Sequence, residues 1–179
     1  PDHAAELRND RRAQSVVVLS ERVAVLRMNT LLGPLTDIRL RRAVSHAIDR
    51  DLIVSTLLGG LDRVVPIFGS PASFGWVEGV EGPRFDQALA RRLVQEAGAA
   101  AQTELVFNTA PVFDQRVVQA IQQMLGEVGL RVRIAMFDTA AYMRRAVGNP
   151  DESGDMTMER WTCTCADVEG ILEPVLRST

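Results

Sequence analysis

Hydrophobic residues recur with a helical period between residues 36 and 60. In the first half of this stretch, Leu40, Ala43, Val44, Ala47 and Ile48 share one face, and arginines occupy the other. The pattern therefore predicts two consecutive amphipathic helices. Short oxygen-bearing side chains can cap each helix by accepting hydrogen bonds from its first free amides. The candidate caps are Thr36 or Asp37 and Asp49 or Asp51, and Gly59 with Gly60 ends the second helix.

The rest of the chain alternates between helical and extended patterns. Residues 61–83 carry Pro66, Pro71 and Pro83 with several glycines, which predicts a long irregular loop. Such an alternation predicts one α/β domain over residues 1–179, with a mixed sheet flanked by helices. The predicted helices are 2–14, 86–97, 114–128, 139–147 and 167–177, and the predicted strands are 15–19, 23–28, 103–108, 130–137 and 155–161.

In the predicted strand 130–137, apolar and polar side chains alternate. Val132, Ile134 and Met136 fall on one face, and Arg131 and Arg133 fall on the other. Successive side chains of a strand point to opposite faces of the sheet. We therefore expect the first face to be buried and the second to be at least partly exposed.

Composition excludes several functions. The chain has arginines but no lysine, so it offers no amine for a Schiff base, a pyridoxal-phosphate enzyme or a Walker-type phosphate loop. The net charge of -3 argues against a nucleic-acid surface, which would need a clustered basic face. No apolar run approaches about 20 residues, so no membrane-spanning helix is predicted. The chain begins at Pro1 without a leader pattern, which says nothing about export of a longer parent protein.

Four segments resemble, in order and spacing, the extracellular solute-binding proteins of the oligopeptide, dipeptide and nickel class (family 5), which serve ABC importers. The first of them, residues 41–54, resembles the family signature R-x-A-hydrophobic-x-x-A-I-D-R-x-x-I-V. The others are a helix that ends in E-A-G, a helix-to-strand unit and a strand that ends in a tryptophan. They cover residues 86–98, 118–134 and 154–161.

The resemblance implies a function in binding rather than catalysis. Family members are much longer, so it implies that this chain is the second lobe of a two-lobed, periplasmic-binding-protein-like fold. The parent protein would be exported to the periplasm or cell surface. It would bind a peptide-like or other small solute between its lobes and deliver that solute to a membrane permease, without a cofactor. Peptide, glutathione-like thiol, sugar, opine and metal chelate all remain open as ligands.

Two other functions are compatible with the sequence. The same module could sense a metabolite in a transcriptional regulator, behind a DNA-binding domain. A self-contained enzyme could instead use the thiols of Cys163 and Cys165. A signal peptide in the parent gene would favour transport, a helix-turn-helix would favour regulation, and a strongly acidic thiol would favour the enzyme.

The resemblance places the ligand site in the segment that leaves the last predicted strand. In the peptide-binding relatives, an aspartate that grips the ligand's amino terminus follows the tryptophan by three residues. This chain has Thr164 at that position, and its first acid is Asp167, which can either contact ligand or cap the next helix. The tryptophan itself can face the ligand or pack in the core. The predicted contacts are Trp161, Thr162, Cys163, Thr164 and Asp167, with backbone groups of residues 161–165.

A second segment, residues 27–30, resembles the family's strand that passes near the cleft. It makes Asn29 and Thr30 secondary candidates for ligand contact. Asparagine is also favoured in turns for its own local hydrogen bonding, and turn chemistry before residue 31 is the alternative.

Cys163 and Cys165 could bind metal, cycle between redox states or simply pack. A zinc or copper site generally needs three or four ligands, and the only histidines are His3 and His46. His46 lies opposite the apolar stripe of its helix, so we expect it to face solvent. The prediction is therefore no metal site, with both thiols in the cleft wall or the core.

Overall fold

The structure, a computed structural model, describes residues 16–162 together with residues 7, 10, 12, 14, 167, 169 and 170. Contacts within the chain divide it into two compact units. Unit 1 comprises Pro1–Val23, Arg50–Gly82 and Arg160–Thr179, and unit 2 comprises Ala24–Asp49 and Pro83–Glu159. The expectation of a single domain over the whole chain stays a prediction.

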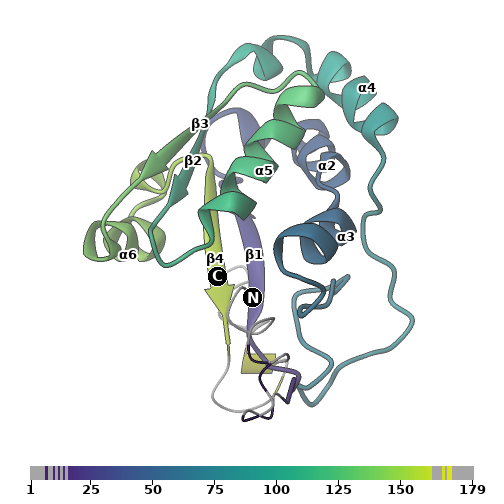
Figure 1. The fold of residues 1–179 in the computed structure, drawn as a ribbon. Coiled ribbons are helices and arrows are strands. Elements are labelled where there is room, and N and C mark those ends of the chain that lie inside the picture. The colour runs from purple at the N-terminus through teal and green to yellow at the C-terminus, as the bar shows by residue number, and fades with distance from the viewer. Residues whose placement is uncertain are drawn as a thin grey trace. The chain divides into compact units, whose positions relative to one another are not determined.

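Among the described residues, four strands form one sheet in the order β1-β4-β2-β3 (Figure 1). β2 is parallel to both of its neighbours, β3 and β4. The N–H of Asn29, just after β1, donates to the carbonyl of Asp155, just before β4, at 2.8 Å, so β1 runs opposite to β4. The mixed sheet confirms the predicted fold class. The strands are β1 (Val23–Met28), β2 (Leu105–Thr109), β3 (Val132–Met136) and β4 (Met156–Trp161).

Each longer helix of unit 2 begins at an aspartate. At α2, the carboxylate of Asp37 accepts a hydrogen bond from the N–H of Arg39 at 2.8 Å. Asp86, Asp114 and Asp138 cap the other three in the same way. Each cap satisfies an amide that the helix leaves unpaired. The four helices are α2 (Ile38–Ala47), α4 (Gln87–Ala97), α5 (Gln115–Glu127) and α6 (Thr139–Val147).

Shorter helical segments connect the longer elements. In unit 1, α3 (Arg50–Leu52) continues directly into η2 (Ile53–Leu57), a π-helical segment, and positive φ angles at Gly59 and Gly60 end this second helix as predicted. Residues 61–83 have no regular element apart from one bridging residue, which confirms the predicted loop. The remaining segments are the 3₁₀ helices η1 (Pro34–Thr36), η3 (Gly98–Gln102) and η4 (Pro150–Glu152).

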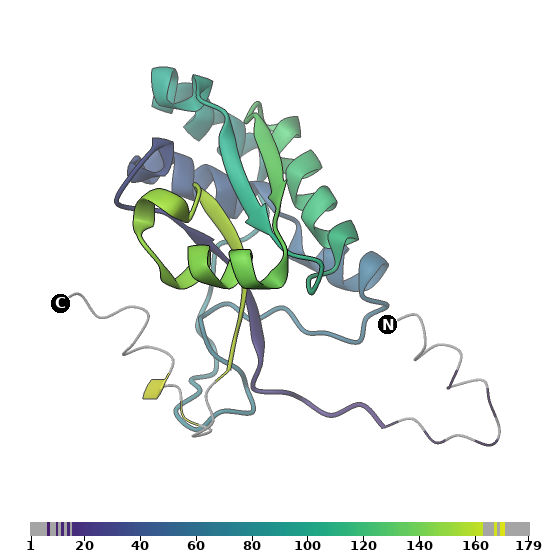
Figure 2. The same ribbon diagram turned by 90° about the vertical axis from the view of Figure 1, so that its left-hand side faces the viewer.

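Unit 2 buries its apolar side chains on both sides of the sheet. α6 lies on the opposite side of the sheet from α2 and α5 (Figures 1 and 2). On the α6 side, Tyr142 packs edge-on against Phe113, with ring centroids 5.4 Å apart. On the helices of the other side, the buried residues are Leu40, Ala43, Val44 and Ala47 of α2, Ala90, Leu93, Val94 and Ala97 of α4, and Val117, Val118, Ile121 and Leu125 of α5.

The structure contradicts two local predictions. Residues 16–19 form no strand and are exposed, because none of the described strands pairs with them. A β-branched run favours a strand only where a partner supplies hydrogen bonds. Met136 is 53 % exposed rather than buried, because β3 is an edge strand and Met136 is its last residue. The predicted helix 2–14 lies mostly, and the helix 167–177 largely, outside the described residues.

Gly154 is expected to resist substitution. Its φ of +68° is a conformation that other residues rarely adopt, and an added Cβ would lie 2.9 Å from Nδ2 of the buried Asn108. That Nδ2 donates to the carbonyl of Ser153 at 2.8 Å. We expect Gly154→Ala to lower the free energy of unfolding by about 1–3 kcal/mol, measured by urea denaturation.

A matched control is Gly126→Ala. Gly126 lies within α5, and a Cβ there would meet nothing within 4 Å. Because glycine is a poor helix former, this variant is expected to be as stable as the wild type or more stable, by up to about 1 kcal/mol. Equal stability of the two variants would show that the structure accommodates a Cβ at residue 154 beside Asn108 without cost.

Candidate functional site

The last strand carries the principal candidate, Trp161. β4 is parallel to β2, with Phe107 opposite Met156 and Asn108 opposite Thr157. In open α/β sheets, ligands bind beyond the carboxyl ends of such strands. Trp161 is the final residue of β4 and is half-buried, and Thr162 follows it and is exposed. Trp161 is therefore a partly exposed aromatic side chain at the carboxyl end of a strand whose first residues pair with β2.

Asp167 has the geometry of a helix cap. Its Oδ1 accepts a hydrogen bond from the N–H of Glu169 at 3.0 Å, and Glu169 is helical. Its backbone also bridges Phe74 in the irregular segment of unit 1. The hydrogen bond with Glu169 therefore supports a capping role for Asp167 over a ligand contact. Cys163 and Thr164, which complete the predicted ligand segment, lie outside the described residues.

Asn29 ties together two loops of unit 2. Its Nδ2 donates to the carbonyl of Pro150 at 2.9 Å, and its Oδ1 accepts from the N–H groups of Leu31 at 3.1 Å and Leu32 at 3.2 Å. The side-chain amide of Asn29 therefore makes local hydrogen bonds that stabilise a turn. This was the alternative to a ligand contact. Thr30 is exposed. Both residues belong to unit 2, whereas Trp161, Thr162 and Asp167 belong to unit 1.

A partly buried ion pair lies between β1 and β4. Nε of Arg27 is 2.8 Å from Oε1 of Glu159, and its Nη2 donates to the carbonyl of Ala146, near the end of α6, at 2.8 Å. Burial raises the pKa of Glu159 above its ordinary value, an effect that Arg27 only partly offsets. Burial, and then the charge of Glu159, also raises the pKa of Tyr142, whose hydroxyl donates to the carbonyl of Met158. Sequence patterns do not reveal this cluster.

The raised pKa of Glu159 predicts a pH dependence of stability. The folded state holds the proton more tightly than the unfolded state, so this contribution is complete below the unfolded pKa, near 4.5, and is lost as pH rises through the folded pKa. We expect the unfolding free energy of the wild type, minus that of Glu159→Gln, to fall as pH rises through this window. Urea denaturation of both proteins from pH 4 to pH 8 measures it, and a constant or rising difference would contradict the assignment.

The described residues contain no group of three or more histidine, cysteine, aspartate or glutamate side chains that could hold a metal ion. Because Cys163 and Cys165 fall outside those residues, the roles weighed for the two thiols stay predictions. Within the described parts of the chain, no helix is both long enough and apolar enough to cross a membrane.

Comparison with known proteins decides the family. The model of the bacterial extracellular solute-binding proteins, family 5 Middle, matches residues 1–179, which is the whole chain. The chain belongs to this family. The resemblance drawn from the four sequence segments is therefore confirmed.

Several solute-binding proteins are similar to this chain. The dipeptide-binding protein of Escherichia coli (strain K12) is 23% identical, covering 90% of this chain and 31% of that protein. The glutathione-binding protein GsiB of Salmonella choleraesuis (strain SC-B67) is 25% identical, covering 99% of this chain and 35% of that protein. The crystal structure of NikA from Brucella suis in complex with Fe(III)-EDTA superposes with a TM-score of 0.81 at 21% identity, covering 98% and 38% of the two chains.

This chain therefore spans about a third of the length of these family members. The structural likeness shows that the fold is shared with part of one lobe of the two-lobed periplasmic binding proteins. The residues predicted for the site remain predictions. Among those that the structure describes, Trp161 is the one that lies at the carboxyl end of a strand.

Proposed function

We propose that this chain is one lobe, the second, of the substrate-binding component of an ABC importer. The lobe binds a peptide-like or other small solute in a cleft closed by the remainder of the parent chain. The observation that carries the proposal is the family match over residues 1–179. The names and titles of the relatives described above state the solutes that they bind, and these relatives give no support to the regulator or thiol-enzyme alternatives.

The proposed ligand contacts are Trp161, Thr162, Cys163 and Thr164, with backbone groups of the same segment. The position of Trp161 supports this assignment, because an aromatic plate fixed by a strand loses little side-chain entropy when a ligand stacks on it. Asp167, Asn29 and Thr30 are secondary candidates, and the first two already hold other hydrogen bonds within the chain.

The proposed setting is the periplasm or the cell surface, with an ABC permease in the membrane as partner. This function requires the two lobes to close around the solute, because the closed lobes bury a ligand that either lobe alone leaves exposed. Delivery follows if the permease distinguishes the closed form from the open form.

A thermal-shift screen of the full-length protein tests the proposal. The panel comprises dipeptides, tripeptides, glutathione, sugars, opines and metal chelates, because relatives bind ligands as different as a dipeptide, glutathione and Fe(III)-EDTA. A ligand at 100 times its dissociation constant stabilises the folded state by about 2.7 kcal/mol, which is a readily measured shift. A dose-dependent shift with one class names the ligand. No shift with any class at millimolar concentration would contradict the proposal.

A further inference from the structure

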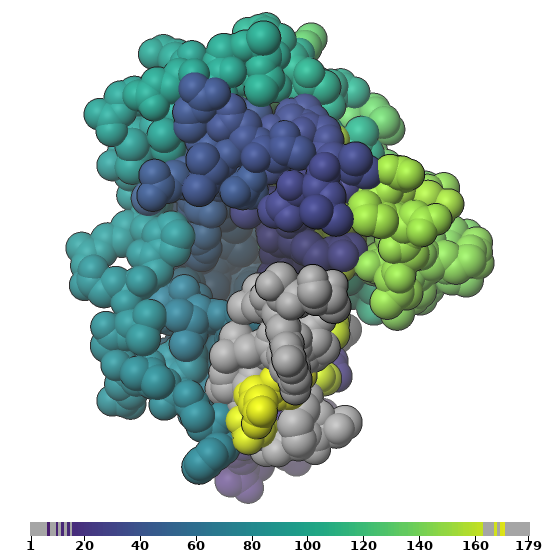
Figure 3. Space-filling view, turned by 180° about the vertical axis from the view of Figure 1, so that it is seen from behind, coloured from purple at the N-terminus to yellow at the C-terminus, as the bar shows by residue number. Residues whose placement is uncertain are grey.

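α2 presents a second stripe of residues, distinct from its buried face. Ile38, Arg41, Arg42, Ser45 and His46 recur at intervals of three and four residues, so they lie along one side of the helix. In Figure 3, α2, coloured dark blue, lies at the surface between the teal residues of α4 and the yellow-green residues that precede β4. Within unit 2, this side of α2 is not covered by another helix.

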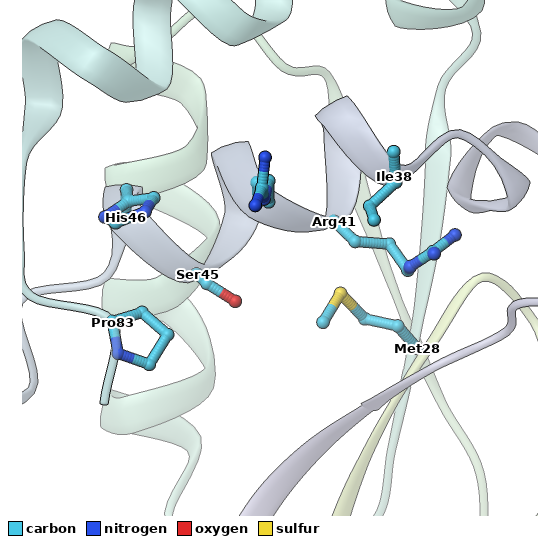
Figure 4. A pocket seen from close by; sticks show the side chains of 7 residues that line it. Met28, Ile38, Arg41, Ser45, His46 and Pro83 are labelled. Carbon is cyan, nitrogen blue, oxygen red and sulfur yellow. The ribbon is translucent and has the colours of Figure 1, made fainter. Parts of the chain in front are cut away.

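The stripe forms a wall of a pocket of about 390 Å³. Met28 of β1 and Pro83 complete the lining, and all of these residues belong to unit 2. In Figure 4, Ser45, His46 and Pro83 lie on one side of the hollow, and Met28 and Arg41 lie on the other. Small-molecule sites commonly have volumes of about 300–1,000 Å³, apolar walls and a few convergent polar groups. The pocket includes none of the ligand contacts proposed above.

Three polar groups on the stripe retain unused hydrogen-bonding capacity. Among the described residues, the side chains of Arg42 and Ser45 have no hydrogen bond or ion pair. Nδ1 of His46 lies 2.7 Å from the carbonyl oxygen of Arg84, which can only accept, so Nδ1 carries the proton and Nε2 is left available. Arg41 differs, because its Nη1 already donates to the carbonyls of residues 35 and 36.

The positive charge of Arg42 favours an anionic ligand, and the position of the pocket along α2 bears on which anion fits. A free guanidinium beside a hydroxyl matches the two oxygens of a carboxylate. Ser45 and His46 lie in the last turn of α2, where the negative end of the helix dipole disfavours a doubly charged phosphate more strongly than a singly charged carboxylate. Met28, Ile38 and Pro83 supply apolar surface beside the polar groups. The pocket therefore suits a single carboxylate attached to a short apolar stem.

We propose that this pocket binds a small aliphatic monocarboxylate. The guanidinium of Arg42 pairs with the carboxylate, Ser45 donates its hydroxyl to one carboxylate oxygen, and the apolar stem lies along Met28, Ile38 and Pro83. This site is separate from the solute-binding function proposed above and does not depend on it.

Saturation-transfer difference NMR on the full-length protein tests the site. The probe is 4-methylpentanoate, and 4-methylpentanamide is its uncharged analogue of the same shape. We expect the acid to bind, with the strongest saturation on its methyl groups, and the amide to bind at least about tenfold more weakly. We expect Arg42→Gln to weaken binding of the acid by about tenfold or more. The matched control is Arg92→Gln, which removes the same charge from an exposed position on α4 and should leave binding unchanged.

Four results would overturn the proposal. They are no saturation of the acid by the wild-type protein, equal binding of acid and amide, equal effects of the two arginine substitutions, and undiminished binding by Arg42→Gln. Because Arg42 is exposed, loss of folding is not expected in its variant, and a thermal unfolding curve verifies this. Ser45→Ala provides a second variant, and we expect it to weaken binding of the acid by a smaller factor than Arg42→Gln.

Discussion

Replacing Phe107 by alanine is expected to lower the free energy of unfolding by about 3–5 kcal/mol, the largest effect on stability that we predict. Phe107 is fully buried in β2, with β3 on one side and β4 on the other, and it pairs with Ile134 and Met156. Its truncation removes apolar contacts from the middle of the sheet and leaves a cavity that the paired strands cannot easily collapse to fill. Urea denaturation of the wild type and the variant measures the change.

Phe74→Ala is the matched control for this substitution. Phe74 is 79 % exposed, so loss of its side chain should change the unfolding free energy by about 0.5 kcal/mol or less. If Phe107→Ala cost no more than this control, the core of unit 2 would not be organised around β2 as described.

The second large effect concerns ligand affinity. We expect Trp161→Ala to weaken binding of the cognate solute by about 30- to 1,000-fold, because a central aromatic anchor typically contributes about 2–4 kcal/mol to binding. The reason is the position of Trp161, half-buried at the end of β4, where a ligand would gain an apolar plate at a low entropic cost. Titration calorimetry on the full-length protein measures the dissociation constant.

Trp76→Ala is the control for the binding experiment. Trp76 is also half-buried, but it lies in the irregular segment of unit 1, and no sequence resemblance connects it with ligand. We expect its substitution to change affinity by less than about threefold, within the range of peripheral positions. Equal losses in the two variants, or full affinity in Trp161→Ala, would show that Trp161 packs in the core and does not contact ligand.

Three helices of unit 2 could be predicted from the sequence to within one or two residues, because helical signals are local. The predicted helix 139–147 matches α6, and the predicted helices 86–97 and 114–128 differ from α4 and α5 mainly at their capping residues. Strands depend on partners that lie far away in the chain. The valine run 16–18 therefore looked like a strand, although no described strand pairs with it.

In the candidate site, too, features with a local sequence signal could be predicted, and features that depend on distant parts of the chain could not. The family resemblance identified Trp161 from a short motif, but no motif indicated the pair of Arg27 and Glu159. That pair exists because β1 lies beside β4, and strand order is set by the packing of the whole sheet. His46 lies on the polar face of α2 as predicted, yet it is half-buried. The segment containing Arg84 passes beside it, and no periodic pattern could predict that contact.

The most direct test of the central proposal is titration calorimetry of the full-length protein with the solute class that the thermal-shift screen identifies. We predict saturable binding of one solute molecule per protein. Folded protein that binds none of the peptides, glutathione, sugars, opines or metal chelates with a saturable heat would contradict the proposed role in solute binding.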